Sequence, residues 1–254
     1  MNIVINRGLV TSLEDLPPYS IALDGRVKGP KIDNKNHRYS LDHHDGCYRY
    51  CTKSATAQAW VFVNGGFDPE PYTCYVNDVD IDVNGATYCF SNPDKCKDTL
   101  VEKLVRAIAL GDEYLGALDH VSNGMINVVK WIAAPELEAK RKEDYNKISD
   151  EGLRSIMEAV HHRIDLYLDG KAQEEIHKYE IDRKEYKKTH IDYTILQNFD
   201  SWVVVDSHNP HVFSSLFKAG FERVVVTRTL PDGSLFCSIA KKMDFTDCFD
   251  LDEM

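Results

Sequence analysis

The chain has 254 residues, 43% of them hydrophobic, and its 41 acidic and 30 basic residues give a formal net charge of -11. This length suits one large domain or two modest ones, and the hydrophobic content suffices for a buried core. The negative charge argues against non-specific binding to duplex DNA, which needs a basic surface, although a metal ion could still attract a small phosphorylated ligand.

The N-terminal segment MNIVINRGLVTSLEDLPPYS has no long apolar run and no small-residue cleavage site, so no signal peptide is expected. No window approaches about eighteen consecutive apolar residues, so we expect no membrane span. The seven cysteines are an odd number without the spacing of a small disulfide-bonded domain. We therefore expect a cytoplasmic protein with free, mostly buried thiols.

In the first part of the chain, apolar runs lead into acidic residues. The run YSIALDG predicts a buried strand that presents the carboxylate of Asp24 at its end. Ligand sites of open α/β sheets lie outside the carboxyl ends of strands. The next stretch, YSLDHHDG, places His43 and His44 between Asp42 and Asp45. Such a stretch is either a polar turn or part of a metal site.

Two helices and an acidic segment are predicted next. The alanine-rich start of SATAQAWVFVNGGF predicts a helix that ends at Gly65, and the helical spacing of KDTLVEKLVRAIALGDEYLGAL brings Asp112 to the end of another. Between them, Asp78, Asp80 and Asp82 alternate in NDVDIDV. Alternate residues of an extended chain share a face, where three carboxylates repel one another unless a cation offsets their charge. The segment is either a metal site or an exposed acidic loop, and the interleaved apolar residues favour the metal site.

The rest of the chain predicts a linker and a second lobe. Residues 136–190 are strongly charged, and we expect helices with solvated faces that link two lobes. Residues 191–254 contain the strand candidate SWVVVDSHN, the short amphipathic helix HVFSSLFKAGF and two β-rich runs around LPDG, which predict a hairpin. The predicted fold is therefore α/β: a lobe with a mostly parallel sheet flanked by helices over residues 1–135, then the helical linker, then a smaller C-terminal α/β lobe.

The acids and histidines together predict a site for a hard metal ion. Carboxylates and imidazole without thiolates favour Mn²⁺ or Mg²⁺, with Fe or Co as further options. Two such ions could activate a water and hold a phosphoryl oxygen. The predicted metal ligands are Asp24, His43, Asp78, Asp80, Asp82 and Asp112.

A structural zinc site is the rival interpretation of HHDGCYRYC, because Cys-x3-Cys lies within the spacing of zinc ligands. Its ligands would be His43, His44, Cys47 and Cys51. No second pair stands at a matching spacing. Another histidine pair, His161 and His162, lies in a helical pattern, where adjacent side chains point in different directions, and we interpret it as structural or exposed.

The C-terminal lobe offers two candidate substrate-binding residues, His208 in VVVDSHNPH and Arg228 ahead of the LPDG turn. Polar loops after strands often contact ligands, and an arginine can bind a phosphate. The alternatives are a plain turn before a helix and an exposed hairpin arginine.

The motifs resemble those of the DHH phosphoesterase superfamily. LDHHDG, followed ten residues on by SATAQAW, is similar to the family's Asp-His-His triplet and the small-residue helix start after it. DVDIDVNGA is similar to its Asp-x-Asp signature, although here it follows the triplet, and Val76 stands where the motif histidine would be. The C-terminal hairpin resembles that of the family's substrate-binding domain without its GGGH stretch.

The resemblance implies that Asp24, His43, Asp80, Asp82 and Asp112 bind two Mn²⁺ or Mg²⁺ ions. It implies that His44 lies beside the scissile phosphate, and we expect Asp42 to orient a histidine or a ligand, so both are candidate catalytic residues. The implied activity is hydrolysis of a nucleotide, a short oligonucleotide or a small phosphate ester by a metal-activated water. The missing histidine leaves a non-catalytic nucleotide-binding protein as the alternative. A homo-oligomer is compatible with the sequence.

Overall fold

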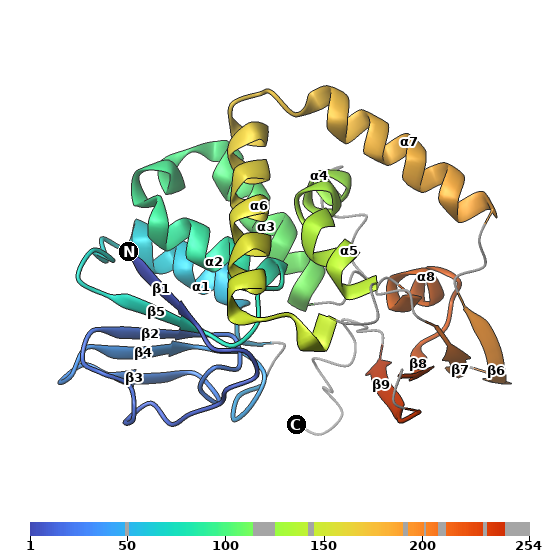
Figure 1. Cartoon of the computed structure of the whole chain (residues 1–254), viewed down its shortest axis with the longest axis horizontal. Coiled ribbons are helices and arrows are strands. Elements are labelled where there is room, and N and C mark those ends of the chain that lie inside the picture. The colour runs from blue at the N-terminus through green and yellow to red at the C-terminus, as the bar shows by residue number, and fades with distance from the viewer. Residues whose placement is uncertain are drawn as a thin grey trace, which may run out of the picture.

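The computed structural model describes residues 1–48, 51–113, 125–141, 145–189, 193–200, 202–207, 212–230 and 233–241. These residues form a mixed α/β protein with two separate sheets (Figure 1). Eight α-helices lie in this described part. The predicted α/β fold class is confirmed at this level.

The first sheet has five strands in the order β1-β5-β2-β4-β3. Its members are β1 (Asn2–Ile5), β2 (Ser20–Leu23), β3 (Lys31–Asp33), β4 (Arg38–Leu41) and β5 (Thr73–Val76). All neighbours pair in parallel except β3, which pairs antiparallel with β4 at one edge. The predicted mostly parallel sheet is therefore confirmed. Because β5, β2 and β4 are adjacent and parallel, the residues that follow them meet at one edge of the sheet.

The described residues up to Leu168 also contain six helices. They are α1 (Ala55–Asn64), α2 (Ile81–Ser91), α3 (Thr99–Glu113), α4 (Met125–Ile132), α5 (Ala134–Arg141) and α6 (Asp150–Leu168), with short 3-10 turns at Pro93–Lys97 and Tyr145–Lys147. Figure 1 shows α1, α2 and α6 on one side of the sheet. The predicted start and end of α1 are confirmed, since the Ser54 side chain caps its first turn and Gly65 ends it.

The charged segment from 136 to 190 is helical, as predicted, but not all of it is a solvated linker. Helix α6 buries Leu153, Met157, Val160 and Ile164 against the core of the first lobe. The spacing of these residues places them on one helical face. Helix α7 (Gln173–Thr189) is much more exposed over its described residues. The boundaries at 135 and 190 stay predictions.

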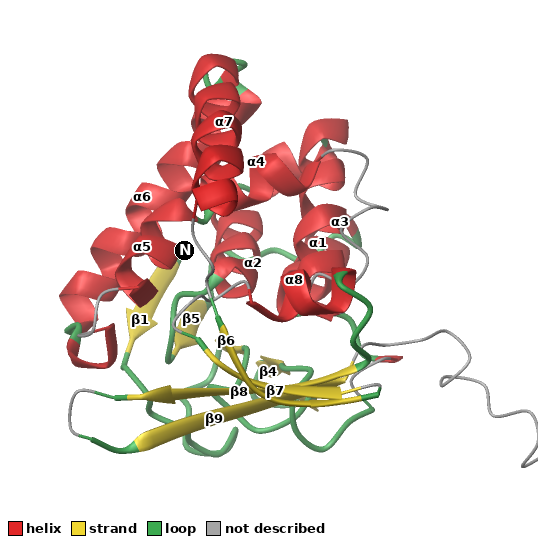
Figure 2. Cartoon of the chain, turned by 90° about the vertical axis from the view of Figure 1, so that its right-hand side faces the viewer, coloured by secondary structure: helices red, strands yellow, loops and turns green. Residues whose placement is uncertain are grey.

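The second sheet has the order β6-β7-β8-β9. Its strands are β6 (Thr194–Phe199), β7 (Trp202–Asp206), β8 (Arg223–Thr229) and β9 (Leu235–Lys241), and helix α8 (Val212–Lys218) lies on one side of it (Figure 2). The predicted strand, helix and hairpin are confirmed. Strand β6 was not predicted, because all six of its residues are exposed and its sequence does not alternate between apolar and polar residues. Among the described residues, no helix is long and apolar enough to cross a membrane.

Helices α1 and α2 pack closely at Gly85, which is buried against Thr56. A Cβ atom at this position would overlap the Thr56 hydroxyl and lie 2.8 Å from Thr56 Cγ2. That hydroxyl donates a hydrogen bond to the Asp82 carbonyl at 2.6 Å, so it has little freedom to move aside. Only glycine allows this approach of the two helices.

The substitution Gly85→Ala is therefore expected to lower the free energy of unfolding by about 1–3 kcal/mol, the usual cost of overpacking. Urea denaturation measures the change. Gly111→Ala is the matched control, because nothing lies within 4 Å of a Cβ at Gly111 in helix α3. Alanine there is expected to be neutral or slightly stabilising. Equal stability of the two variants would refute the tight helix contact.

Candidate metal centre

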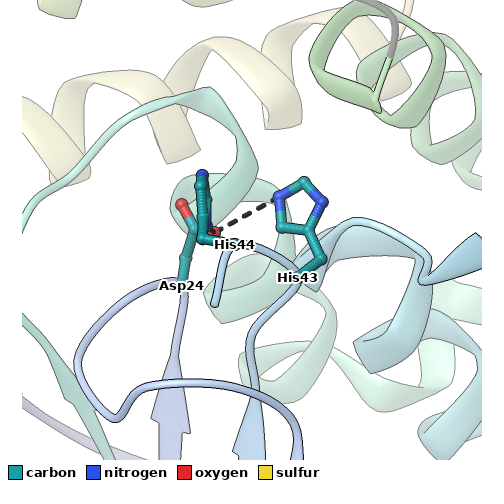
Figure 3. Close-up of side chains that lie close together, drawn as sticks. All are labelled: Asp24, His43 and His44. Atoms are coloured by element: carbon teal, nitrogen blue, oxygen red, sulfur yellow. Dashed lines mark ion pairs between the residues drawn. The ribbon is translucent and has the colours of Figure 1, made fainter. Parts of the chain in front are cut away.

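Three side chains meet where strands β2 and β4 end: Asp24, His43 and His44 (Figure 3). Asp24 Oδ1 lies 3.4 Å from His43 Nε2 and 3.1 Å from His44 Nδ1. Asp24 has a positive φ of 43°, a conformation that costs most non-glycine residues free energy. Such local strain is often found at functional sites, and here it aims the carboxylate at the two imidazoles.

A second group shares His43 and adds carboxylates from two helices, Asp82 from α2 and Asp112 from α3. His43 Nε2 lies 2.9 Å from Asp112 Oδ2 and 3.9 Å from Asp82 Oδ2. The side chains of His43 and Asp82 are fully buried. His43 therefore faces one carboxylate from a strand end and two from helices.

The Asp82 carboxylate is held by the N-terminus of helix α1. It accepts hydrogen bonds from the backbone N–H of Ala55 at 2.6 Å and of Thr56 at 2.9 Å. Both donors belong to the first turn of the helix, where unpaired N–H groups and the helix dipole favour a negative charge. The contact fixes Asp82 beside His43 although the two residues are far apart in the sequence.

Asp42 organises the loop that carries both histidines. Its buried carboxylate accepts hydrogen bonds from the backbone N–H groups of Gly25, Gly29, His43 and His44 at 2.7–3.1 Å. It also lies 3.0 Å from His44 Nδ1. These contacts support the orienting role predicted for Asp42.

The predicted row of acids along an extended segment is wrong. The chain leaves strand β5 at Val76 and enters helix α2 at Ile81, so the three acids do not share one face of a strand. Asp80 caps the helix by accepting the Val83 N–H at 2.9 Å. Asp78 accepts hydrogen bonds from the Tyr145 hydroxyl at 2.6 Å and from the Val79 N–H at 2.8 Å.

Of the six predicted metal ligands, the structure therefore brings Asp24, His43, Asp82 and Asp112 into the two groups. It adds His44, which was predicted to face the substrate. Asp78 and Asp80 belong to neither group. Both are half-buried at the same edge of the sheet.

The carboxylates around His43 repel one another, and burial together with this repulsion raises the pKa of the most buried among them. Burial, and then the charges of Asp112 and Asp24, raise the pKa of Asp82 to about 7. Burial and the charge of Asp24 also raise the pKa of Asp80. Burial lowers the pKa of His43, but the contacts with Asp112 and Asp24 outweigh this effect and raise the pKa to about 10. The site thus favours a positive charge at its centre.

The buried polar atoms provide a test of whether a cation fits. Neither ring nitrogen of His43 nor Asp24 Oδ1 forms a hydrogen bond of good geometry, although all three atoms are inaccessible to solvent and the contacts of His43 Nε2 with Asp24 and Asp112 are ion pairs. Buried polar groups without partners are rare in folded proteins because they are costly. A cation bound between the imidazole nitrogen and the carboxylate oxygens would satisfy Asp24 Oδ1 and His43 Nε2. The donor set fits Mn²⁺ or Mg²⁺.

The rival zinc site receives no support from the geometry. Cys47 is partly buried and Cys51 is exposed. Neither metal-compatible group found in the described part of the chain contains a cysteine. His161 packs against Tyr88 and lies 3.1 Å from Thr87 Oγ1, and His162 is exposed, so the structural and surface roles predicted for this pair are confirmed.

The two candidate substrate-binding residues of the C-terminal lobe stay predictions. The Arg228 guanidinium stacks on the Phe236 ring at 4.4 Å. His208 lies outside the described residues.

Sequence reasoning missed Glu113, which borders the site. Its carboxylate accepts the Ser54 N–H at 2.9 Å and so joins the end of α3 to the start of α1. No local pattern predicts this contact, because the two residues are 59 positions apart.

Comparisons with protein-family models, with curated proteins and with solved structures find no match for this chain.

Proposed function

We propose that the chain is a metal-dependent phosphohydrolase of the DHH type that acts on a nucleotide, a short oligonucleotide or a small phosphate ester. One observation carries the proposal: the fully buried His43 Nε2 lies within 4 Å of the carboxylates of Asp24, Asp82 and Asp112. The location supports it, since the carboxyl edge of a parallel sheet is where such folds bind ligands.

The residues present would hold two Mn²⁺ or Mg²⁺ ions through Asp24, His43, Asp82 and Asp112. When bound, such ions activate a water and offset the charge that develops on a phosphoryl oxygen. His44 is the most exposed member of its group, with 39% of its side chain accessible, so it can contact a bound phosphate. Asp42 keeps His44 in place through the ring contact and the backbone hydrogen bonds of the loop.

The test is hydrolysis of a panel of phosphodiesters and phosphoanhydrides by the purified protein with Mn²⁺. We expect turnover of at least one substrate, lost on addition of EDTA and reduced at least about a hundredfold in Asp82→Asn. The control Asp45→Asn removes an exposed carboxylate of the histidine loop and is expected to retain activity. Absence of metal-dependent turnover above that of Asp82→Asn would rule the enzyme out.

A non-catalytic nucleotide-binding protein is the second candidate, and one observation favours it. Asp80, a predicted metal ligand, uses one carboxylate oxygen to cap helix α2 and belongs to neither metal-compatible group. The number of ions bound per chain, measured by elemental analysis after Mn²⁺ loading and desalting, separates the two candidates. Two ions favour the enzyme, and one or none favours the binding protein.

A further inference from the structure

A second polar site lies beside the metal centre at the same edge of the sheet. A cavity of about 580 Å³ is lined by Arg7, Gly8, Asn77 and Asp78, which follow strands β1 and β5. Its volume lies within the range of small-molecule sites. The Asn77 side-chain amide donates a hydrogen bond to the Gly25 carbonyl at 3.1 Å, and Gly25 directly follows the candidate ligand Asp24. The cavity wall and the metal centre are thus physically joined.

Both the backbone and the side chain of Arg7 are held in position at this cavity. Its backbone N–H donates a hydrogen bond to Asp150 Oδ1 at 2.8 Å, at the start of helix α6. Its guanidinium lies 4.6 Å from the centre of the Tyr145 ring. A cation placed over an aromatic ring is stabilised and loses little further freedom when a ligand binds. Arg7 is therefore preorganised.

The guanidinium of Arg7 has donor capacity left for a ligand. Its Nη1 atom is buried and has no hydrogen-bond partner. Within the ranges that the structure describes, its guanidinium forms no ion pair with a carboxylate. Lys140 contacts the same Tyr145 ring, but it pairs with Glu136 at 2.6 Å. An arginine presents several N–H donors in one plane, which suits a phosphate or a carboxylate.

Asp78 is the acidic group of the wall. Its Oδ1 atom accepts hydrogen bonds from the Tyr145 hydroxyl and from the Val79 N–H. Among the described residues it forms no ion pair with Arg7, so the guanidinium donors of Arg7 are not occupied by this carboxylate.

We propose that Arg7 binds a second anionic group of the substrate, one that is not cleaved. This inference rests on the proposed function, because it assumes that the cleaved group lies at the metal centre. Strand β1 is two strands away from β2, and neighbouring strands are about 4.8 Å apart, so the ends of these two strands are separated by about 10 Å. That separation exceeds the one between two directly joined phosphoryl groups. The geometry thus favours a substrate whose two anionic groups are separated by further atoms.

The experiment follows the side-chain Nε–H signals of arginine by NMR while the metal-free protein is titrated with inorganic phosphate in EDTA. We expect a saturable shift of one signal that is absent from the spectrum of Arg7→Gln. Arg106→Gln, which removes an exposed arginine paired with Glu102, is the matched control and should leave the shift in place. Arg7→Lys keeps the charge without the planar donors and is expected to bind phosphate about tenfold more weakly.

Two results would overturn the inference: no arginine signal that shifts with phosphate, or a shifting signal that persists in Arg7→Gln. His43→Gln separates this inference from the proposed function, because phosphate binding in EDTA does not need the metal ligands and should survive that substitution. Failure of the enzyme with intact phosphate binding would remove the proposed function and leave the anion site. In an active enzyme, Arg7→Gln should raise KM for a substrate with two separated phosphates about tenfold, with kcat changed by less than about twofold.

Discussion

The substitution His43→Gln is expected to weaken Mn²⁺ binding by at least about a hundredfold. Changes to residues that merely support a metal ligand already cost about 10–100-fold in affinity, and His43 is common to both metal-compatible groups. Its Nε2 atom is the point on which the carboxylates of Asp24, Asp82 and Asp112 converge. Removing the imidazole therefore weakens the binding of every metal ion that these groups hold. The EPR signal of free Mn²⁺ measures the change.

The matched control is His162→Gln, because His162 is exposed on helix α6 and contributes to neither group. It is expected to bind Mn²⁺ as the unmodified chain does. Circular dichroism of both variants shows whether the fold is retained. Folded His43→Gln protein with the Mn²⁺ affinity of the control would be incompatible with the site as described.

The second large effect is expected on stability. Asp42→Asn should lower the free energy of unfolding by at least about 3 kcal/mol. The buried carboxylate accepts hydrogen bonds from four backbone N–H groups, and a hydrogen bond to a charged group contributes about 1.5–3 kcal/mol. The asparagine side chain has only one oxygen that can accept these hydrogen bonds, and its NH₂ group would face backbone N–H donors. Urea denaturation gives the value.

Asp45→Asn is the control for this prediction, because it makes the same change three residues later in the same loop. The Asp45 side chain is 60% exposed and lies 3.6 Å from an exposed Lys28, so we expect a change within about 0.5 kcal/mol. If both variants lost the same stability, the hydrogen bonds of Asp42 would not be what holds the loop.

The sequence predicted the part of the site that depends on strand ends. Apolar runs that lead into Asp24 and into the DHH triplet mark two parallel strands, and adjacent parallel strands place such residues at one edge. The helical spacing before Asp112 likewise predicted helix α3. These signals are local, since each depends only on the composition of a short segment.

The error at Asp78 to Asp82 has a physical cause. Helix α2 is buried over nearly its whole length, so its sequence lacks the polar face that identifies a surface helix. The alternating acids resemble a strand, whereas Asp80 is in fact the N-cap of the helix. An aspartate ahead of a run of small and apolar residues is a capping signal that could have predicted the helix start.

The contacts that complete the site cannot be predicted from local patterns. The hydrogen bonds from Ser54 to Glu113 and from Tyr145 to Asp78 join distant segments, and so does the contact of Arg7 with Tyr145. They depend on how α3 and the segment between α5 and α6 pack against the sheet edge. The buried face of α6 was detectable in principle, because its apolar residues recur at helical spacing within a charged segment.

Anomalous X-ray scattering from crystals soaked in Mn²⁺ would locate the bound metal directly. We expect a manganese peak within coordination distance of His43 Nε2, with Asp24, Asp82 and Asp112 as oxygen ligands, and no such peak in crystals of His43→Gln. A peak at Cys47 or Cys51, or no peak near His43 at a saturating Mn²⁺ concentration, would contradict a hard-metal centre at this edge of the sheet.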